Sequence, residues 1–150
     1  MTTTAVDRVF IDTNILVFAQ LALAPHHAAA VARLNELAAG GAEVWISRQV
    51  LREYLSAMTK PGVLTGTIPI TSLAADVQKF ENYFQVAEDG PPVTVFLIGL
   101  ICTIQVLGKQ IHDANIVATM QAHGIPKLLT HNTADFARYS SIITVVPLIP

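Results

Sequence analysis

Charged residues of either sign are scarce in this chain of 150 residues. Only 13% of the residues are Asp, Glu, Lys or Arg, and the net charge at pH 7 is −2. This balance excludes a broad basic surface of the kind that attracts polyanions. It also excludes intrinsic disorder, because disordered chains are highly charged and poorly hydrophobic, whereas 52% of these residues are hydrophobic. We therefore expect one domain over residues 1–150 with a large core, and an apolar surface that a partner covers.

Cysteine and long apolar runs are scarce as well. The single cysteine, Cys102, excludes an internal disulfide, and we expect a small buried thiol in a reducing compartment, the cytoplasm. The first seven residues lack the basic and apolar regions of a signal peptide. The longest apolar stretch, 93–107, is shorter than the roughly 20 residues that a membrane-spanning helix needs. We expect no membrane segment and predict a buried helix there.

Hydrophobic periodicity and the positions of glycine and proline predict alternating strands and helices. Strands are expected at 8–12, 43–46, 127–130 and 142–148. Helices are expected from residue 13 through 23, at 26–39, 48–58, 73–85 and 93–107, from 109 to a stop at 123–126, and after the turn at 131–136. Ser47 and Ser72 suit helix N-caps, and 63–69 suits a loop or short extended segment. This order predicts an α/β domain with a parallel sheet.

The end of the first strand carries a carboxylate, a hydroxyl and an amide side by side, in Asp12, Thr13 and Asn14. In an open sheet of mostly parallel strands, ligands bind beyond the carboxyl ends of the strands. Asp12 is therefore placed for chemistry. An Asp also suits the N-cap of the following helix, and that simpler role stays open here.

Three further acids fall beside strand ends or on helices. Asp113 falls in the first turn of a helix, Asp135 follows the strand 127–130, and Glu53 lies on the helix after the strand 43–46, at the edge of its apolar stripe. Each has a simpler role, such as interaction with the helix dipole or a solvated ion pair. If the sheet forms as expected, four of the eleven acids share its crevice end.

Carboxylates gathered in one pocket repel one another, and a divalent cation removes the conflict. Oxygen ligands without paired Cys or His favour Mg²⁺ or Mn²⁺ over Zn²⁺. Mg²⁺ commonly binds one or two carboxylates together with substrate phosphate, so it would let an acidic protein bind a polyanion. The sequence thus predicts a Mg²⁺ site, with Mn²⁺ as the alternative ion.

Four segments of the chain resemble motifs of the PIN-domain family, in particular of the VapC-type toxin ribonucleases. They are residues 10–14, 47–54, 112–118 and 129–136, and the similarity covers nearly the whole chain. The resemblance implies a three-layer α/β/α domain with a central, mostly parallel sheet of four to five strands. It makes Asp12 and Asp113 the core Mg²⁺ ligands, and Asp135 and Glu53 complete the acidic pocket, directly or through water.

The resemblance also assigns supporting residues, a reaction and partners. Asn14 and Thr130 match polar positions that orient the acids or the attacking water, and Asn132 stands where some members carry a further acid. The implied reaction is hydrolysis of an RNA phosphodiester by metal-activated water attacking in line, with one ion or two. Such toxins are usually homodimers and are held in check by a cognate antitoxin protein. The RNA target stays undefined.

Two other functions remain open at this point. A phosphotransfer domain of the receiver or aspartyl-phosphatase type also uses a strand-end Asp and Mg²⁺. However, Lys127 stands at the start of its strand instead of after it, and Asn14 stands where the phosphatases carry a second acid. A PIN-like module that binds RNA or a partner without cleavage is the other alternative, and the presence of all four acids argues against it.

Some residues near the acids receive no catalytic role. His112 and His131 are neighbours of the acidic motifs, but a general base must lie within hydrogen-bond reach of the proton it takes. Arg52 and Arg138 could contact phosphate or pair with the acids. Aromatic side chains such as Trp45 and Tyr139 are expected to pack in the fold.

Overall fold

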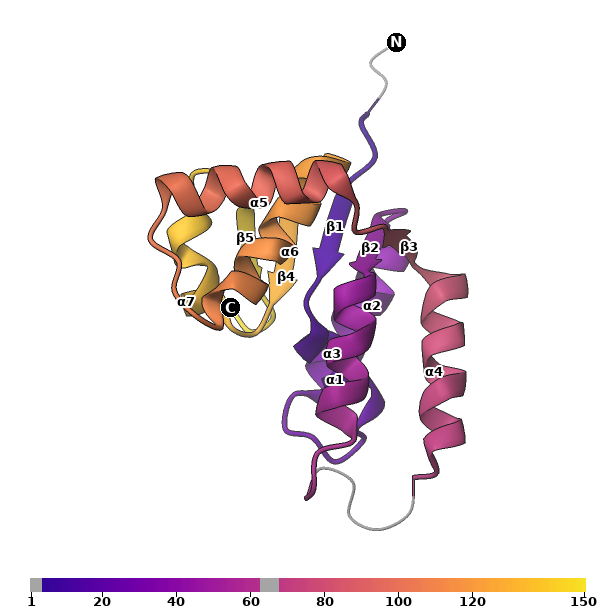
Figure 1. Ribbon diagram of the computed structural model, residues 1–150. Helices are drawn as coiled ribbons and strands as arrows, with labels where there is room; N and C mark the ends of the chain where they lie inside the picture. Colours follow the sequence, from indigo (N-terminus) through magenta and orange to yellow (C-terminus); the bar gives the residue numbers. More distant parts are fainter. Residues whose placement is uncertain (1–3, 63–67) are drawn as a thin grey trace.

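In a computed structural model of the protein, which describes residues 4–62 and 68–150, five parallel strands form one sheet between helices (Figure 1). The strands are β1 (Arg8–Ile11), β2 (Glu43–Ser47), β3 (Gln85–Ala87), β4 (Lys127–Thr130) and β5 (Thr144–Pro147). Their order across the sheet is β3-β2-β1-β4-β5. Every neighbouring pair is parallel, which confirms the predicted α/β class.

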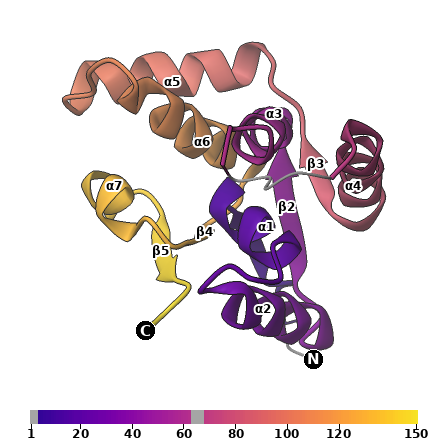
Figure 2. The same ribbon diagram turned by 90° about the horizontal axis from the view of Figure 1, so that it is seen from below.

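The helices cover both faces of this sheet. They are α1 (Thr13–Gln20), α2 (His27–Ala39), α3 (Arg48–Met58), α4 (Ile70–Tyr83), α5 (Pro91–Thr103), α6 (Gln110–His123) and α7 (Thr133–Phe136), followed by a 3₁₀ turn over Ala137–Tyr139. Figure 2 shows α2 and α6 on opposite sides of the sheet, with α5 outside α6 and α4 beside the β3 edge. The three layers confirm the architecture that the resemblance implied.

The core lies along the three central strands. Phe10 and Ile11 of β1, Ile46 of β2 and Leu128 with Leu129 of β4 have no exposed surface. Consecutive residues are buried because helices cover both faces, which is why these strands have apolar runs instead of alternating patterns. The parallel pairs Ile11–Leu129 and Phe10–Leu128 bring the ends of β1 and β4 together. This alignment positions the polar residues that follow each strand.

The edge strand β3 was not predicted. The sequence suggested a helix over 73–85 with Ser72 as its cap, but α4 starts at Ile70, behind an extended Pro69, and ends at Tyr83. Three residues are too few to show a strand pattern, and β3 forms because β2 offers a neighbouring edge. Of the predicted loop at 63–69, residues 63–67 lie outside the described part of the chain.

Other boundaries differ by a few residues. α1 stops at Gln20 instead of Leu23, and Leu23 is fully exposed, so it has no core to pack against. β5 starts at Thr144 because the backbone N–H groups of Ile142 and Ile143 bond the carbonyl of Tyr139 in a turn. The bounds of β1, β2, β4, α2, α3 and α6 agree with the prediction to within one residue, apart from the end of α6, which was predicted only as a stop at 123–126. The helix predicted at 93–107 is instead α5, which starts at Pro91 and ends at Thr103.

The helix α5 is not the buried helix that its composition suggested. Val93 and Leu100 are buried against the core, but Val95 is 71% exposed and Ile98 is 53% exposed. Cys102 is exposed too, so the expectation of a buried thiol was wrong. α5 is exposed because it packs on the outside of α6, so that only one stripe of this all-apolar helix contacts the core (Figure 1). Within the described residues, every helix is too short or too polar to cross a membrane.

Candidate active site

Asp12 lies directly beyond β1 and is 6% exposed. Its Oδ1 accepts a hydrogen bond from the backbone N–H of Thr13 at 2.8 Å, which caps α1. Its Oδ2 accepts from the Thr130 hydroxyl at 2.8 Å and from the Asn14 amide at 3.1 Å. Burial raises the pKa of Asp12, and these hydrogen bonds oppose that rise. The helix cap and the strand-end acid are therefore one and the same side chain.

The groups that hold Asp12 are themselves held by the end of β4. The amide oxygen of Asn14 accepts from the backbone N–H of His131 at 3.1 Å. The Thr130 hydroxyl oxygen accepts from the backbone N–H of Asn132 at 3.0 Å. Asn14 and Thr130, which the resemblance assigned to orientation, thus contact Asp12 directly, whereas Asn132 reaches it through its backbone and Thr130.

Glu53 is held from two sides, by Thr13 and by Gln49, and the sequence pattern assigned no role to Gln49. Its Oε2 accepts from the Thr13 hydroxyl at 2.8 Å and its Oε1 accepts from the Gln49 amide at 2.9 Å. The same Gln49 amide donates to the carbonyl of His112 at 2.8 Å, and its oxygen accepts from Asn115 at 2.8 Å. Gln49 thereby links α3 to the first turns of α6. Its only sequence signal is its place one helical turn before Glu53.

Asp113 in the first turn of α6 and Asp135 in α7 complete the acidic group. All four acids, Asp12, Glu53, Asp113 and Asp135, line one cavity of ≈ 400 Å³. Burial, followed by the negative charges of the other three acids, raises the pKa of Asp113 to about 6. Within the described residues, neither the Asp113 nor the Asp135 carboxylate accepts a hydrogen bond from the protein.

Basic side chains of the described residues do not pair with the acids of this cavity. In the described part of the chain, none of the four carboxylates forms an ion pair with a basic side chain. Lys60 lines the cavity, and Arg52 is exposed. Arg138 donates instead to the Gln105 carbonyl and to the Gln110 side chain, both at 2.9 Å. Among the described residues, no ion pair therefore offsets the repulsion among the acids.

The donor set fits a hard divalent cation. The four acids offer only oxygen atoms, which favour Mg²⁺ or Mn²⁺ over softer ions. Over residues 4–62 and 68–150, no three acidic, histidine or cysteine side chains already have the arrangement of a metal-binding group. Mg²⁺ does not require such a group, because it keeps several waters and typically takes one or two carboxylates.

Comparison with protein families matches residues 9–142 to the PIN domain. The chain belongs to the PIN domain family. A curated relative, Ribonuclease VapC24 of Mycobacterium tuberculosis, is 30% identical over 131 residues, which cover 86% of this chain and 89% of the relative. The resemblance that the four motifs carried is thus confirmed.

Solved structures share the fold of this PIN domain. VapBC2 from Rickettsia felis, bound to a DNA fragment from its promoter, superposes with a TM-score of 0.67 at 18% identity, covering 93% of this chain and 97% of the other. VapC20 of Mycobacterium tuberculosis, a sarcin-ricin loop cleaving toxin, gives 0.66 at 18% identity, covering 93% and 99%. At these identities the likeness shows the fold alone.

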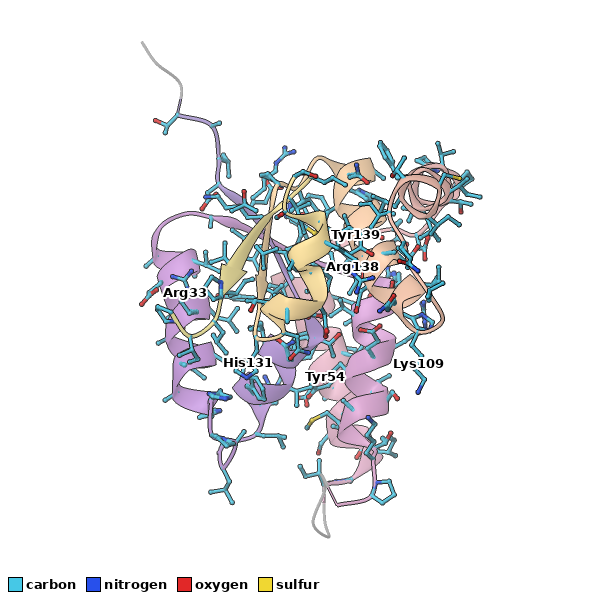
Figure 3. All side chains as sticks on the ribbon, turned by 90° about the vertical axis from the view of Figure 1, so that its left-hand side faces the viewer. Arg33, Tyr54, Lys109, His131, Arg138 and Tyr139 are labelled. Carbon is cyan, nitrogen blue, oxygen red and sulfur yellow. The ribbon has the colours of Figure 1, made fainter. Side chains whose placement is uncertain are left out.

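Two histidines of this PIN domain, His112 and His131, contact the site through their backbones. The carbonyl of His112 accepts from Gln49, and its side chain is exposed. The backbone N–H of His131 bonds Asn14, while its ring packs against His26 with the ring centroids 4.3 Å apart. Figure 3 shows His131 below Arg138 and Tyr139 on the same side of the molecule. Tyr139 is buried, in agreement with the packing role that the sequence suggested.

Proposed function

We propose that this PIN domain is a Mg²⁺-dependent endoribonuclease and the toxin of a toxin–antitoxin pair. The observation that carries the proposal is the cavity lined by Asp12, Glu53, Asp113 and Asp135, whose charges the described part of the chain leaves unpaired. RNA as the substrate class is supported by the ribonuclease among the relatives. A bound cation explains how an acidic cavity contacts a phosphodiester.

The four acids would have two different roles, ion binding and orientation of a water molecule. Asp12, Asp113 and Asp135 would hold Mg²⁺ or Mn²⁺. Such an ion, when bound, lowers the pKa of its water and offsets charge on the phosphoryl oxygens. Glu53 is fixed by donors on both of its oxygens, and each oxygen keeps a second lone pair that can accept from a water molecule. Its role would be to orient that water.

The direct test is cleavage of a folded RNA by purified protein with Mg²⁺, with EDTA, and by the variant Asp113→Asn. Loss of several kcal/mol of transition-state stabilisation should reduce the rate on the order of 10³-fold in the last two reactions. The matched control is Asp7→Asn, because Asp7 pairs with Lys127 at the opposite end of β1. Equal cleavage in all four reactions would identify a contaminant. Labelling of Asp12 by a small phosphodonor would instead favour phosphotransfer.

A second copy of the chain is our proposed cover for α5. The exposed side chains of Val95, Phe96, Ile98 and Ile101 form an apolar face, and α5 carries no charged residue. A symmetric dimer would remove this face from water. Light scattering should give a dimer for the wild type and a monomer for Ile98→Glu, while Leu23→Glu, at an exposed apolar residue elsewhere, should stay dimeric. A monomeric wild type would contradict the dimer.

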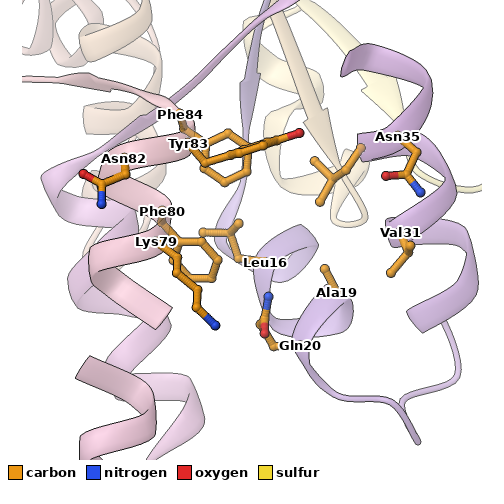
Figure 4. A pocket seen from close by; sticks show the side chains of 11 residues that line it. Leu16, Ala19, Gln20, Val31, Asn35, Lys79, Phe80, Asn82, Tyr83 and Phe84 are labelled. Atoms are coloured by element: carbon orange, nitrogen blue, oxygen red, sulfur yellow. The ribbon is translucent and has the colours of Figure 1, made fainter. Parts of the chain in front are cut away.

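The cognate antitoxin is our proposed occupant of a second apolar surface. A cavity of ≈ 540 Å³ lies between α1, α2 and α4 and is lined by side chains such as Leu16, Phe80 and Phe84 (Figure 4). Other residues of α1, Val17 and Phe18, line the acidic cavity. One helix therefore separates the two cavities. An antitoxin segment that fills the apolar cavity and continues around α1 would reach the acidic cavity and obstruct the acids.

A further inference from the structure

Three aromatic rings from separate segments meet beside the acidic cavity. Phe18 comes from α1, His26 precedes α2, and His131 follows β4. The centroids of the two imidazoles are 4.3 Å apart, and Phe18 approaches them edge-on at 5.2 Å and 5.5 Å. All three side chains are partly exposed. We call these residues the aromatic cluster.

Hydrogen bonds fix the aromatic cluster relative to the acids. The backbone N–H of His131 bonds Asn14, whose amide donates to Asp12. Phe18 lines the same cavity as Asp12, and its carbonyl lies 2.8 Å from the Nδ1 atom of His27. A group that stacks on the cluster would therefore lie next to a phosphate held at the acids.

Packing against the core accounts for only part of this arrangement, because Phe18 contacts the core but all three side chains stay partly exposed. By contrast, Phe10, Phe136 and Tyr54, which lie deep in the core, are at most 1% exposed. The aromatic cluster stays accessible, and two of its three rings are imidazoles. Partly exposed rings of this kind are the surfaces on which proteins stack unpaired bases of RNA.

We propose that the aromatic cluster stacks an unpaired base of the RNA, next to the phosphodiester that the acids receive. The inference rests on the proposed ribonuclease function. The chain lacks a net positive charge, and among the described residues Lys60 is the only basic side chain that lines the cavity. Stacking would supply affinity that phosphate contacts do not, because each base has a flat face independent of its sequence.

The test combines variants of the protein with abasic positions in a short single-stranded RNA. At one position near the cleaved bond, removal of the base should raise the KM of the wild type about 5- to 150-fold, the equivalent of the 1–3 kcal/mol of one stacked base. His26→Ala and His131→Ala should raise KM to a similar extent with the intact RNA. In these variants the abasic position should have little further effect, and His26→Phe should restore the wild-type KM.

The matched control is His123→Ala. His123 also packs against an aromatic ring, that of Trp45 at 5.9 Å, but it lies at the far end of α6 from Asp113. Its removal should leave KM and the abasic effect unchanged. If the wild type cleaves RNA and no base position depends on His26 or His131, the stacking site is refuted while the ribonuclease stands. If the wild type cleaves no RNA, both are refuted.

Discussion

The acidic cavity has a fixed half and an open half. In the fixed half, Asp12 and Glu53 accept hydrogen bonds from Thr13, Asn14, Thr130 and Gln49. In the open half, the carboxylates of Asp113 and Asp135 accept none from the described residues. Figure 1 shows the elements that carry the two halves, β1 and α3 for the first and α6 and α7 for the second.

The two halves differ in their protein hydrogen-bond donors because their carboxylates differ in burial. Asp12 is nearly inaccessible to water, so its oxygens need protein donors. Asp113 is half-buried and Asp135 is exposed, so water can serve them. Carboxylates that have no protein donors keep their lone pairs for an ion or a water molecule. The fixed half thus sets the shape of the site, and the open half retains the free ligand atoms.

Removing a support of the fixed half should have the largest effect on stability. Thr130→Val deletes the hydroxyl that donates to the Asp12 carboxylate and accepts from the backbone of Asn132. A hydrogen bond to a charged group contributes about 1.5–3 kcal/mol, so the free energy of unfolding should fall by about that amount. Denaturant unfolding of the metal-free protein measures it.

Thr119→Val is the matched control for this change. Thr119 is also buried, but its hydroxyl donates to the Asn115 carbonyl within its own helix. Its replacement should cost about 1 kcal/mol, the typical worth of one neutral hydrogen bond. Equal costs at the two threonines would mean that the bond to Asp12 is no stronger than an ordinary one, and the fixed half would lose its basis.

Loss of Gln49, the side chain that links the two halves, should have the next largest effect. Gln49→Met keeps the side-chain volume but removes the donors to Glu53 and to the first turn of α6. We expect kcat for RNA cleavage to fall about 10- to 100-fold, as it does when residues that orient a metal site are replaced. KM should change little, because Gln49 does not line the cavity. Gln78→Met, at an exposed glutamine on α4, is the control, and an unchanged kcat for Gln49→Met would exclude this role.

The sequence predicted the acids better than their supports. Asp12 was found because a β-branched run ends at it, and Asp113 because an acid at a helix start is a local pattern. Gln49 was missed because its bond to Asn115 joins residues 66 positions apart and depends on how α3 packs on α6. A glutamine is also usually exposed, so its burial has no signal in composition.

The sequence also failed to predict which of two neighbouring helices, α5 or α6, is buried. α5 is apolar along its length and largely exposed, whereas α6 carries polar residues and is buried from Ile116 through Met120. Hydrophobicity predicted that both segments are helices, although α5 ends at Thr103 and not at the predicted residue 107. It did not predict that α6 lies against the sheet and α5 outside it, because that order depends on tertiary packing and on what covers α5.

The smallest change in stability should come from a substitution in the open half. It should stabilise the protein, whereas Thr130→Val destabilises it. The pKa of Asp113 is raised from 3.8 to about 6 by burial and by the neighbouring acids, so the folded protein binds this proton more tightly than the unfolded chain. Stability from this group is present below pH 4 and is lost as the pH rises through 6. Asp113→Asn should therefore stabilise the metal-free protein by about 1 kcal/mol at pH 7.5, after allowance for solvent screening, and by nearly nothing at pH 4. Unfolding in EDTA at the two pH values measures the difference. A variant less stable than the wild type at pH 7.5 would show that the negative charge of Asp113 does not destabilise the metal-free folded protein.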